Sequence, residues 1–300
     1  MFLSISEVVE IKGNEKKYIS ENVETLGSRT KEWFKNAETG ESLIFKYSRE
    51  NTGEHWSEVI ASYIAQCLEI PHASYAFAKL KQNVGVLSPN FVPIGCQLVM
   101  GNEMIVSVDQ KYDKLKSAPA DYTVQKVWQT LKNYSLKKEW RGASAENLFL
   151  QYLFLDALVG NVDRHHENWG VIVDSKGPTF SLAPTFDHAS SMGRELTDTK
   201  REQKLKTRDQ NFNVSYYAKK AKCHLRDSET SKKLSPCEAY LQFRGLCPTG
   251  EDTHLKLLNR INEDKLAKLV REAPIDFMSS ISKDFAIEFL VSCLERLRKL

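Results

Sequence analysis

The sequence has few cysteines, and their spacing fits neither a metal site nor a redox pair. Only six of the 300 residues are cysteine, none of them forms a C-x-x-C pair, and none has zinc-finger spacing to a pair of histidines. Scattered cysteines in a chain of this length are typical of a reducing compartment. We therefore expect a cytosolic protein whose fold depends on neither disulfides nor structural zinc.

Long apolar segments and a strong excess of charge are also missing. The net charge of +3 is too small by itself to indicate a nucleic-acid or membrane partner. The first ten residues include acids and no continuous apolar stretch, so no secretory signal is expected. The most apolar segment, Leu148 to Gly160, is interrupted by Gln151 and Asp156. It is too short to span a bilayer and is predicted to be a buried helix.

The chain contains no internal repeat and no low-complexity tract, so its organisation follows from hydrophobic periodicity. Up to about residue 101 the period is mostly that of strands, apart from a helix at 53–68 that Pro71 prevents from continuing. The pattern breaks at Gly101-Asn102, and helical periods dominate from about residue 123 onward. Strands are expected at 5–11, 18–23, 32–35, 42–47, 74–80, 84–87 and 97–100, a hairpin at 169–173 and 179–182, and helices at 123–134, 145–159, 252–260, 264–271 and 283–300.

This order predicts an α+β chain of two lobes. The strand-rich N-lobe would comprise residues 1–101, and the helical C-lobe would comprise residues 102–300. A cleft between two such lobes is a common place for a ligand.

Three polar residues follow the predicted helix that ends at Gly160, a residue suited to a left-handed helix cap. They are Asp163, the amide Asn168 five positions later, and a second acid, Asp187, after one hairpin. A carboxylate can orient a substrate hydroxyl or take its proton, while amide and carboxylate oxygens hold Mg²⁺ on a nucleotide. The pattern predicts phosphoryl transfer from ATP, with Asp163 as the base and Asn168 and Asp187 as Mg²⁺ ligands.

Other residues of the same segment leave alternatives open. Arg164 and His165 could bind phosphate or hold the loop, and the sequence does not choose between these roles. His165, His166 and His188 could instead join the two acids in a transition-metal site of a hydrolase. Adjacent histidines on a loop rarely face the same way, and the sequence has no H-E-x-x-H motif, so the magnesium interpretation is favoured.

A candidate phosphate lysine lies upstream. Lys46 ends the apolar strand Leu43–Phe45, and Glu58 on the following helix is its natural ion-pair partner. The alternative is two solvated surface charges. The segment Gly27–Lys31 could close over phosphates with its backbone N–H groups, but it has one glycine and no G-x-G-x-x-G pattern, so an ordinary turn explains it equally well.

At this point the motifs resemble a known family. The sequence G-N-V-D-R-H-H-E-N-W-G at 160–170, followed by L-A-P-T-F-D at 182–187, is similar to the HipA-like serine/threonine kinases of bacterial toxin–antitoxin systems. Their motif runs approximately G-N-x-D-R-H-x-x-N and then L-A-P-x-(Y/F)-D. The resemblance extends over roughly residues 25–300 and is strong only at 145–190. It implies a bilobal, protein-kinase-like fold, with Asp163 as catalytic base, Asn168 and Asp187 as Mg²⁺ ligands and Lys46 as the phosphate lysine.

The resemblance also implies further contacts with ATP. The segment Leu87 to Asn102 looks like the inter-lobe strand and hinge, so the adenine is expected near Gln97 and Met100. Several family members autophosphorylate a serine in the phosphate loop, which makes Ser28 and the nearby Thr30 candidate sites. Gly27, Ser28, Arg164 and His165 are the candidate contacts to the nucleotide phosphates, together with Lys46 and its partner Glu58.

Partners are implied by the resemblance as well. The longest family members carry an extra N-terminal subdomain that contacts the antitoxin, and this chain looks like the compact form, so an antitoxin or regulator is expected to be a separate chain. The substrate would be a cytosolic protein, such as an aminoacyl-tRNA synthetase, in the bacterial cytoplasm. Two alternatives remain: a host-directed effector kinase that is secreted, and a nucleotide-binding pseudokinase that acts through a partner.

The segment 200–226 is rich in lysine and arginine. A solvated face is the favoured interpretation, and a docking patch for an acidic protein or RNA is the alternative. No RNA-binding signature accompanies it, so direct contact with nucleic acid is not expected, and neither is contact with a membrane.

Overall fold

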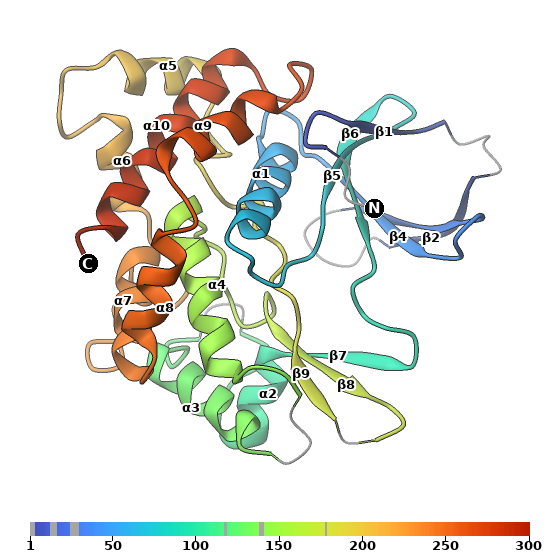
Figure 1. The fold of residues 1–300 in the computed structure, drawn as a ribbon, viewed down its shortest axis with the longest axis vertical. Helices are drawn as coiled ribbons and strands as arrows, with labels where there is room; N and C mark the ends of the chain where they lie inside the picture. The colour runs from blue at the N-terminus through green and yellow to red at the C-terminus, as the bar shows by residue number, and fades with distance from the viewer. Residues whose placement is uncertain (1–3, 13–16, 25–29, 117–118, 138–140, 178) are drawn as a thin grey trace.

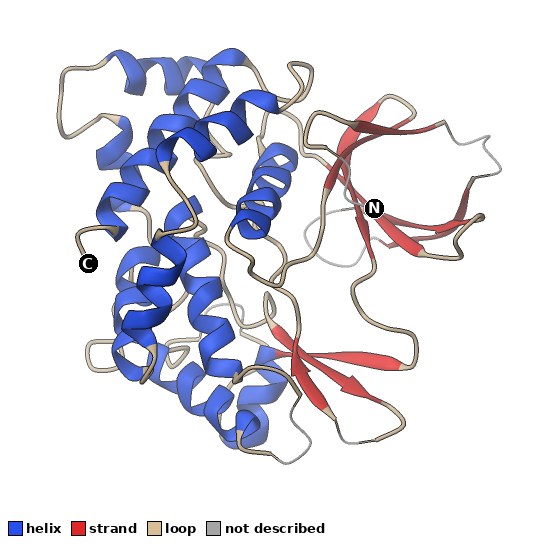
Figure 2. Ribbon diagram, viewed as in Figure 1, coloured by secondary structure: helices blue, strands red, loops and turns tan. Residues whose placement is uncertain are grey.

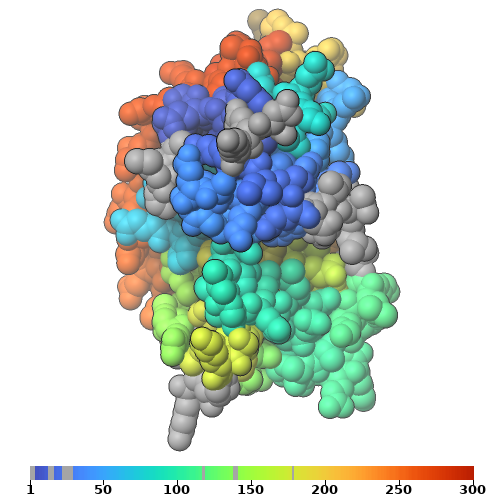
Figure 3. Space-filling view, turned by 90° about the vertical axis from the view of Figure 1, so that its right-hand side faces the viewer, coloured from blue at the N-terminus to red at the C-terminus, as the bar shows by residue number. Residues whose placement is uncertain are grey.

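The computed structural model describes residues 4–12, 17–24, 30–116, 119–137, 141–177 and 179–300. It confirms the predicted α+β class and the division into a strand-rich and a helix-rich part (Figure 2). In Figure 3 the N-terminal strands, in blue, form the upper part of one face, above later segments in teal, green and yellow.

The N-terminal part is a curled six-stranded sheet (Figure 1). Its strands, in the order β1-β5-β6-β4-β3-β2, are antiparallel except for the parallel pair β1 and β5. Their bounds are β1 Val8–Ile11, β2 Tyr18–Glu24, β3 Lys31–Asn36, β4 Ser42–Tyr47, β5 Ala76–Leu80 and β6 Asn83–Pro89.

The helical part surrounds one largely buried helix, α4. The helices are α1 Glu54–Cys67, α2 Gly101–Val108, α3 Val124–Ser135, α4 Ala145–Val159, α5 Asp198–Lys206, α6 Val214–Lys220, α7 Pro236–Leu246, α8 Gly250–Leu258, α9 Glu263–Glu272 and α10 Ser280–Leu297. Helix α4 packs against α1, α3, α7, α8 and α10, which confirms the predicted buried helix. Within the described ranges, no helix is both long and apolar enough to cross a bilayer.

Strand alternation decides which side chains of β4 face the helices. Leu43 and Phe45 are buried in a small apolar cluster on one face of the sheet. Because successive side chains of a strand point to opposite faces, Lys46 lies on the other face. Helix α1 packs against β5, β6, α4 and α9, and so joins the sheet to the helices on that face.

A second, three-stranded sheet connects the two parts. Strand β7 (Cys96–Met100) pairs with β8 (Gly170–Asp174), and β8 pairs with β9 (Phe180–Leu182). The chain does not break at Gly101 as the sequence suggested, because α2 begins there directly after β7. Glycine is required at this position, since a Cβ atom on Gly101 would lie 2.2 Å from the ring of Trp169. A lobe boundary at residue 101 stays a prediction, and β7 pairs with β8 across it.

Candidate active site

The candidate catalytic loop starts at the end of α4. Gly160 caps this helix with a φ of +65°, the left-handed conformation that glycine adopts most easily. A Cβ atom there would lie 2.4 Å from the ring of Phe289, so the close approach of α10 also requires glycine. The predicted cap is confirmed, and the next eight residues leave from the end of a rigid, buried helix.

A buried ion pair fixes the loop to α4. Arg164 Nε donates to Asp156 Oδ2 at 2.7 Å, and its Nη2 donates to Asp156 Oδ1 at 2.8 Å. The side chains are 1% and 2% exposed, respectively. Asn161 Nδ2 also donates to Asp156 Oδ1, at 2.8 Å. Two parallel hydrogen bonds of this kind hold a guanidinium in one orientation.

The same arginine connects the catalytic loop to the segment before Asp187. Arg164 Nη1 donates to the carbonyl oxygens of Asn168 and Phe186, and Nη2 donates to Thr185 Oγ1 at 2.9 Å. Nη2 also lies 3.0 Å from His188 Nε2. Of the two roles that the sequence left open for Arg164, these contacts are those of a residue that holds the loop.

His188 is a neutral acceptor in this network. Burial lowers the pKa of His188 well below its usual range, and the neighbouring positive charge of Arg164 lowers that pKa further. A neutral imidazole can use Nε2 as an acceptor for the Arg164 guanidinium. The groups around the Arg164 guanidinium are therefore all acceptors of its hydrogen bonds.

Asn168 is oriented by the loop itself. Its Nδ2 donates to the carbonyl oxygen of Asp163 at 2.7 Å, and the residue is 4% exposed. Within the described part of the chain, no donor bonds to the Asn168 Oδ1 atom. The amide is thus turned so that a neutral oxygen, a ligand suited to Mg²⁺, is left for another partner.

Asp187 follows in an unusual backbone conformation. Its φ of +61° lies in the left-handed region, which costs energy for residues other than glycine and concentrates at functional sites. The side chain is 37% exposed. The preceding residue, Phe186, stacks on Phe91 with ring centroids 5.3 Å apart, so the segment between β6 and β7 supports this turn.

The side chain of Lys46 extends from β4 to two carboxylates, those of Glu58 and Asp187. Its Nζ lies 3.8 Å from Glu58 Oε2 and 3.4 Å from Asp187 Oδ1. It also donates to the hydroxyl of Tyr75 at 3.2 Å. Glu58 is fully buried on α1, and its other oxygen accepts the backbone N–H of His188 at 2.8 Å. The ion pair expected from the sequence is present, and the interpretation of both residues as solvated surface charges is wrong.

Burial and nearby charges act in opposite directions on the pKa of His165. Burial is the largest effect on this imidazole and lowers the pKa of His165. The nearby carboxylates of Asp163 and Asp187 act in the opposite direction. Asn168 contacts the backbone of Asp163, and Arg164 joins the carbonyl oxygens of Asn168 and of Phe186, the residue before Asp187. That the three predicted side chains form one site stays a prediction.

His224 is a residue of this site that the sequence did not indicate. Its Nε2 lies 3.2 Å from Asp163 Oδ1, and its ring meets His165 edge-on with centroids 5.6 Å apart. His224 Nδ1 is buried and has no hydrogen-bond partner among the described residues. The residue belongs to no motif and lies 61 positions after Asp163, within the basic segment 200–226, so no local pattern could connect the two.

The remaining candidate residues are not placed against the site by any contact. Gly27 and Ser28 lie outside the described residues. Thr30 is exposed, and its carbonyl accepts the N–H of Tyr47 at 3.3 Å. Gln97 pairs with Val173 across β7 and β8, and Met100 is the N-cap of α2. Contacts of these residues with a nucleotide stay predictions.

The described residues offer little support for a transition-metal centre. Among them, no group of three or more His, Cys, Asp or Glu side chains has an arrangement that could hold a metal ion. His166 instead bonds through Nδ1 to the Tyr112 hydroxyl at 2.7 Å, and His188 faces Arg164. A site for Mg²⁺ needs fewer protein ligands, because one or two side-chain oxygens suffice when nucleotide phosphates supply others.

Comparison with known proteins gives matches at the level of both sequence and fold. Residues 10–240 match the family described as the HipA-like C-terminal domain. A curated relative, the serine/threonine-protein kinase CtkA of Helicobacter pylori, is 30% identical over 141 residues, which is 46% of this chain and 40% of that one. The alignment therefore spans less than half of the relative.

Two solved structures have a similar fold. The crystal structure of the Helicobacter pylori proinflammatory kinase CtkA has a TM-score of 0.77 at 20% identity, over 97% of this chain and 99% of the other. The HipA of Shewanella oneidensis, solved with HipB and operator DNA, has a TM-score of 0.53 at 13% identity, over 95% of this chain and 64% of the other. At these identities the likeness establishes the fold.

Proposed function

This chain belongs to the HipA-like family, and from that premise we propose that it is an ATP-dependent serine/threonine protein kinase. Similarity to a serine/threonine kinase supports a kinase-like function. The observation that carries the finer proposal is Lys46, held 3.8 Å from Glu58 and 3.4 Å from Asp187, beside the loop of Asp163 and Asn168. This combination of a strand lysine, a helix acid and two polar loops is the arrangement that phosphoryl transfer needs.

The residues of the site fit a bound Mg²⁺ with nucleotide. Asn168 Oδ1 and the Asp187 carboxylate would hold the ion, since an amide oxygen and a half-exposed carboxylate are hard oxygen ligands. When bound, the ion would neutralise charge on the phosphates. The ammonium group of Lys46 would bind phosphate oxygens, and its fixed position between two carboxylates would keep that group in place before the nucleotide arrives.

Asp163 would act on the substrate hydroxyl. Its carboxylate is 40% exposed, and we propose that it orients a serine or threonine hydroxyl and accepts its proton. His224 would hold this carboxylate by donating from Nε2 to Oδ1. With the proton on Nε2, the buried Nδ1 of His224 carries no hydrogen, so this tautomer leaves no buried N–H group unpaired.

The substrate and partners are proposed from the family. A cytosolic protein such as an aminoacyl-tRNA synthetase would be phosphorylated by a toxin kinase, with autophosphorylation at Ser28 or Thr30 as a further activity. The Shewanella HipA structure contains HipB and DNA, which favours a separate antitoxin chain here as well. The relative described as a proinflammatory kinase favours the second candidate, a host-directed effector kinase. A nucleotide-binding pseudokinase would not need all four of the residues Lys46, Asp163, Asn168 and Asp187.

The proposed function is tested by phosphate transfer. Purified protein is incubated with γ-labelled ATP in a cell lysate and with casein as a generic acceptor, with and without an excess of EDTA over Mg²⁺. We expect label on protein only when Mg²⁺ is free, and intact-mass analysis should show any phosphate on the chain itself. Nucleotide binding without label on any protein would exclude the kinase and leave the pseudokinase.

The Lys46→Met variant should bind and use ATP poorly. A hydrogen bond to a charged group is worth about 1.5–3 kcal/mol, so we expect kcat/KM for ATP to fall by roughly 10–150-fold. Lys35→Met, on the neighbouring strand and exposed, is the matched control and should change little. Titration with a fluorescent ATP analogue measures the same loss in binding. Equal affinity of the two variants would remove Lys46 from the site.

A further inference from the structure

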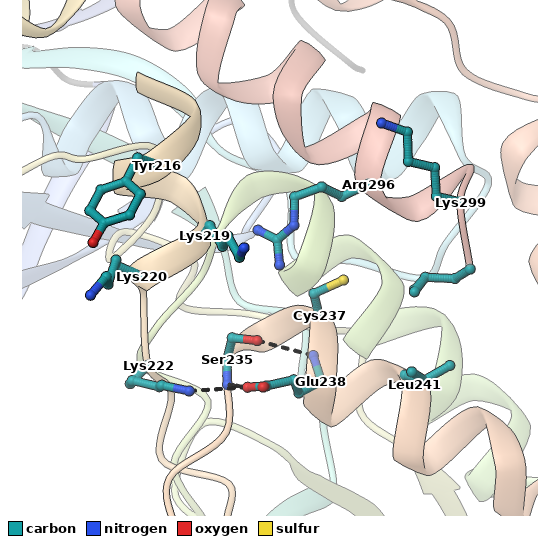
Figure 4. A pocket seen from close by; sticks show the side chains of 11 residues that line it. Tyr216, Lys219, Lys220, Lys222, Ser235, Cys237, Glu238, Leu241, Arg296 and Lys299 are labelled. Carbon is teal, nitrogen blue, oxygen red and sulfur yellow. Dashed lines mark hydrogen bonds and ion pairs between the residues drawn. The ribbon is translucent and has the colours of Figure 1, made fainter. Parts of the chain in front are cut away.

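A basic pocket lies apart from the nucleotide site, where α6, α7 and α10 meet (Figure 4). Its cavity volume is about 520 Å³. The basic pocket is defined by the five cationic side chains that line it: Lys219, Lys220, Lys222, Arg296 and Lys299.

Most of this positive charge is not neutralised inside the pocket. Glu238 is the acidic side chain that lines it, and Glu238 is already bonded to Lys222 Nζ at 3.1 Å and to the N–H of Ser235 at 2.6 Å. In the described part of the chain, no ion pair joins the other four cations to a carboxylate. Figure 4 shows Lys219 and Arg296 pointing toward one another. Like charges that converge in a hollow raise the local positive potential and attract anions.

Helix dipoles account for only part of this arrangement. Lys219 and Lys220 are in the last turn of α6, and Arg296 is in the last turn of α10, where cations are favoured. That effect acts on each helix separately. It gives no reason for Lys219 of α6 and Arg296 of α10 to point toward one another (Figure 4).

The pocket is close to the candidate catalytic residue along the chain. Lys222 precedes His224 by two residues, and His224 Nε2 lies 3.2 Å from Asp163 Oδ1. Two residues span at most about 7 Å of backbone. The side chains of Lys222 and His224 add to this span, so an extended peptide with one side chain in the pocket would present a hydroxyl at Asp163 from a position several residues away.

The residues that line the basic pocket fit a peptide better than RNA. Apolar atoms of Leu241 and Tyr216 line the pocket beside the cations, which suits the mixed surface of a peptide. Single-stranded RNA binds along extended basic tracks with aromatic rings free to stack on bases. Tyr216 is the aromatic residue lining this pocket, and Lys220 Nζ already lies over its ring, 5.0 Å from the centroid.

We propose that the basic pocket docks an acidic segment of the protein substrate, several residues from the phosphorylated hydroxyl. The proposal rests on the kinase function above and adds a substrate class to it: serine or threonine with glutamate, aspartate or a phosphorylated residue nearby. This proposal gives a function to the lysines in the second half of the basic segment 200–226. Lys219, Lys220 and Lys222 line the basic pocket together with residues at the end of α10.

A binding experiment tests the pocket independently of catalysis. The probe is a fluorescein-labelled peptide with one serine and six glutamates, compared with the same peptide carrying glutamines and with an RNA hexanucleotide, at constant ionic strength. The variant is Lys219→Glu with Lys220→Glu. The control, Lys200→Glu with Arg208→Glu, makes the same charge change at exposed positions of the same basic segment but outside the pocket.

We expect the glutamate peptide to bind, the glutamine peptide to bind at least tenfold more weakly, and the pocket variant to lose at least tenfold in affinity while the control stays within twofold. Equal losses in both variants would show attraction by net charge alone and overturn the proposal. The proposal would also be overturned if the RNA hexanucleotide bound more tightly than the glutamate peptide and lost this affinity in the pocket variant.

The kinase assay separates this proposal from the proposed function. With the glutamate peptide as acceptor, the pocket variant should raise KM for peptide at least tenfold with kcat and KM for ATP retained. If no acceptor is phosphorylated by any form of the protein, the kinase function fails. The binding experiment with the fluorescein-labelled peptide still decides whether the pocket binds an acidic peptide. An unchanged KM for an acceptor that is phosphorylated would overturn docking.

Discussion

Replacing Asp163 by asparagine is expected to lower the rate of phosphate transfer by about 10²–10⁴-fold, which corresponds to a barrier higher by roughly 3–5 kcal/mol. Asparagine has nearly the same shape as aspartate but cannot accept the proton of the hydroxyl. The side chain is 40% exposed, so the substitution leaves no buried charge without a partner. The initial rate of label transfer from ATP to casein measures the effect.

The matched control for this variant is Glu167→Gln. Glu167 belongs to the same loop and is 53% exposed, and its carboxylate lies 3.8 Å from the Nδ1 atom of His165. Removing this acid should change the rate by less than a few-fold. Asp163→Asn should keep its affinity for a fluorescent ATP analogue, since the residue is assigned to the hydroxyl and not to the nucleotide. A near-native rate for Asp163→Asn, or equal losses in both variants, would refute its role as the base.

The second large effect concerns the stability of the active-site framework. Asp156→Leu should lower the free energy of unfolding by about 3–5 kcal/mol, because it leaves the guanidinium of Arg164, only 1% exposed, without its carboxylate. Leucine has the same branching as aspartate and is larger, so the substitution opens no cavity and the unpaired charge is the main cause of the loss. Urea denaturation followed by tryptophan fluorescence gives the free energy, provided the transition is two-state.

The double variant Asp156→Leu with Arg164→Met serves as the control for this experiment. It removes both charges, and replacing a buried ion pair by apolar residues is often close to neutral for stability. We expect it to recover most of the stability that the single variant loses. Kinase activity should stay low, because Arg164 also holds Asn168 and the segment at Thr185 and Phe186. A single variant within about 1 kcal/mol of the natural chain would contradict the assignment of this pair.

The predictions from sequence that the structure confirms rest on local patterns. The strand expected at 42–47 is β4, and its Lys46 contacts Glu58, the partner expected from the sequence. The apolar residues of 145–159 predicted the buried helix α4, and Gly160 predicted its left-handed cap. These signals are readable in a single chain because they depend on backbone geometry and on neighbours within a few residues. The hairpin expected between Asn168 and Asp187 is also present, as β8 and β9, while the meeting of these two side chains stays a prediction.

Contacts between distant segments were not readable in this way. The approach of His224 to Asp163 depends on where the segment between α6 and α7 crosses the catalytic loop. The role of Arg164 was open until burial and its contacts with Asp156 and Thr185 were known. Each of these depends on how helices and loops pack, and no pattern of residue types along the chain encodes it.

By itself, the sequence determined the α+β class, the family motif and the residue types of the site, because secondary structure and motif chemistry depend on residues near one another in the chain. Tertiary structure alone decided that Lys46 also contacts Asp187, that His224 contacts Asp163, and that the basic residues of α6 and α10 share one pocket. These arrangements arise when the buried faces of α1, α4 and α10 pack together, which brings side chains into contact across long separations in sequence.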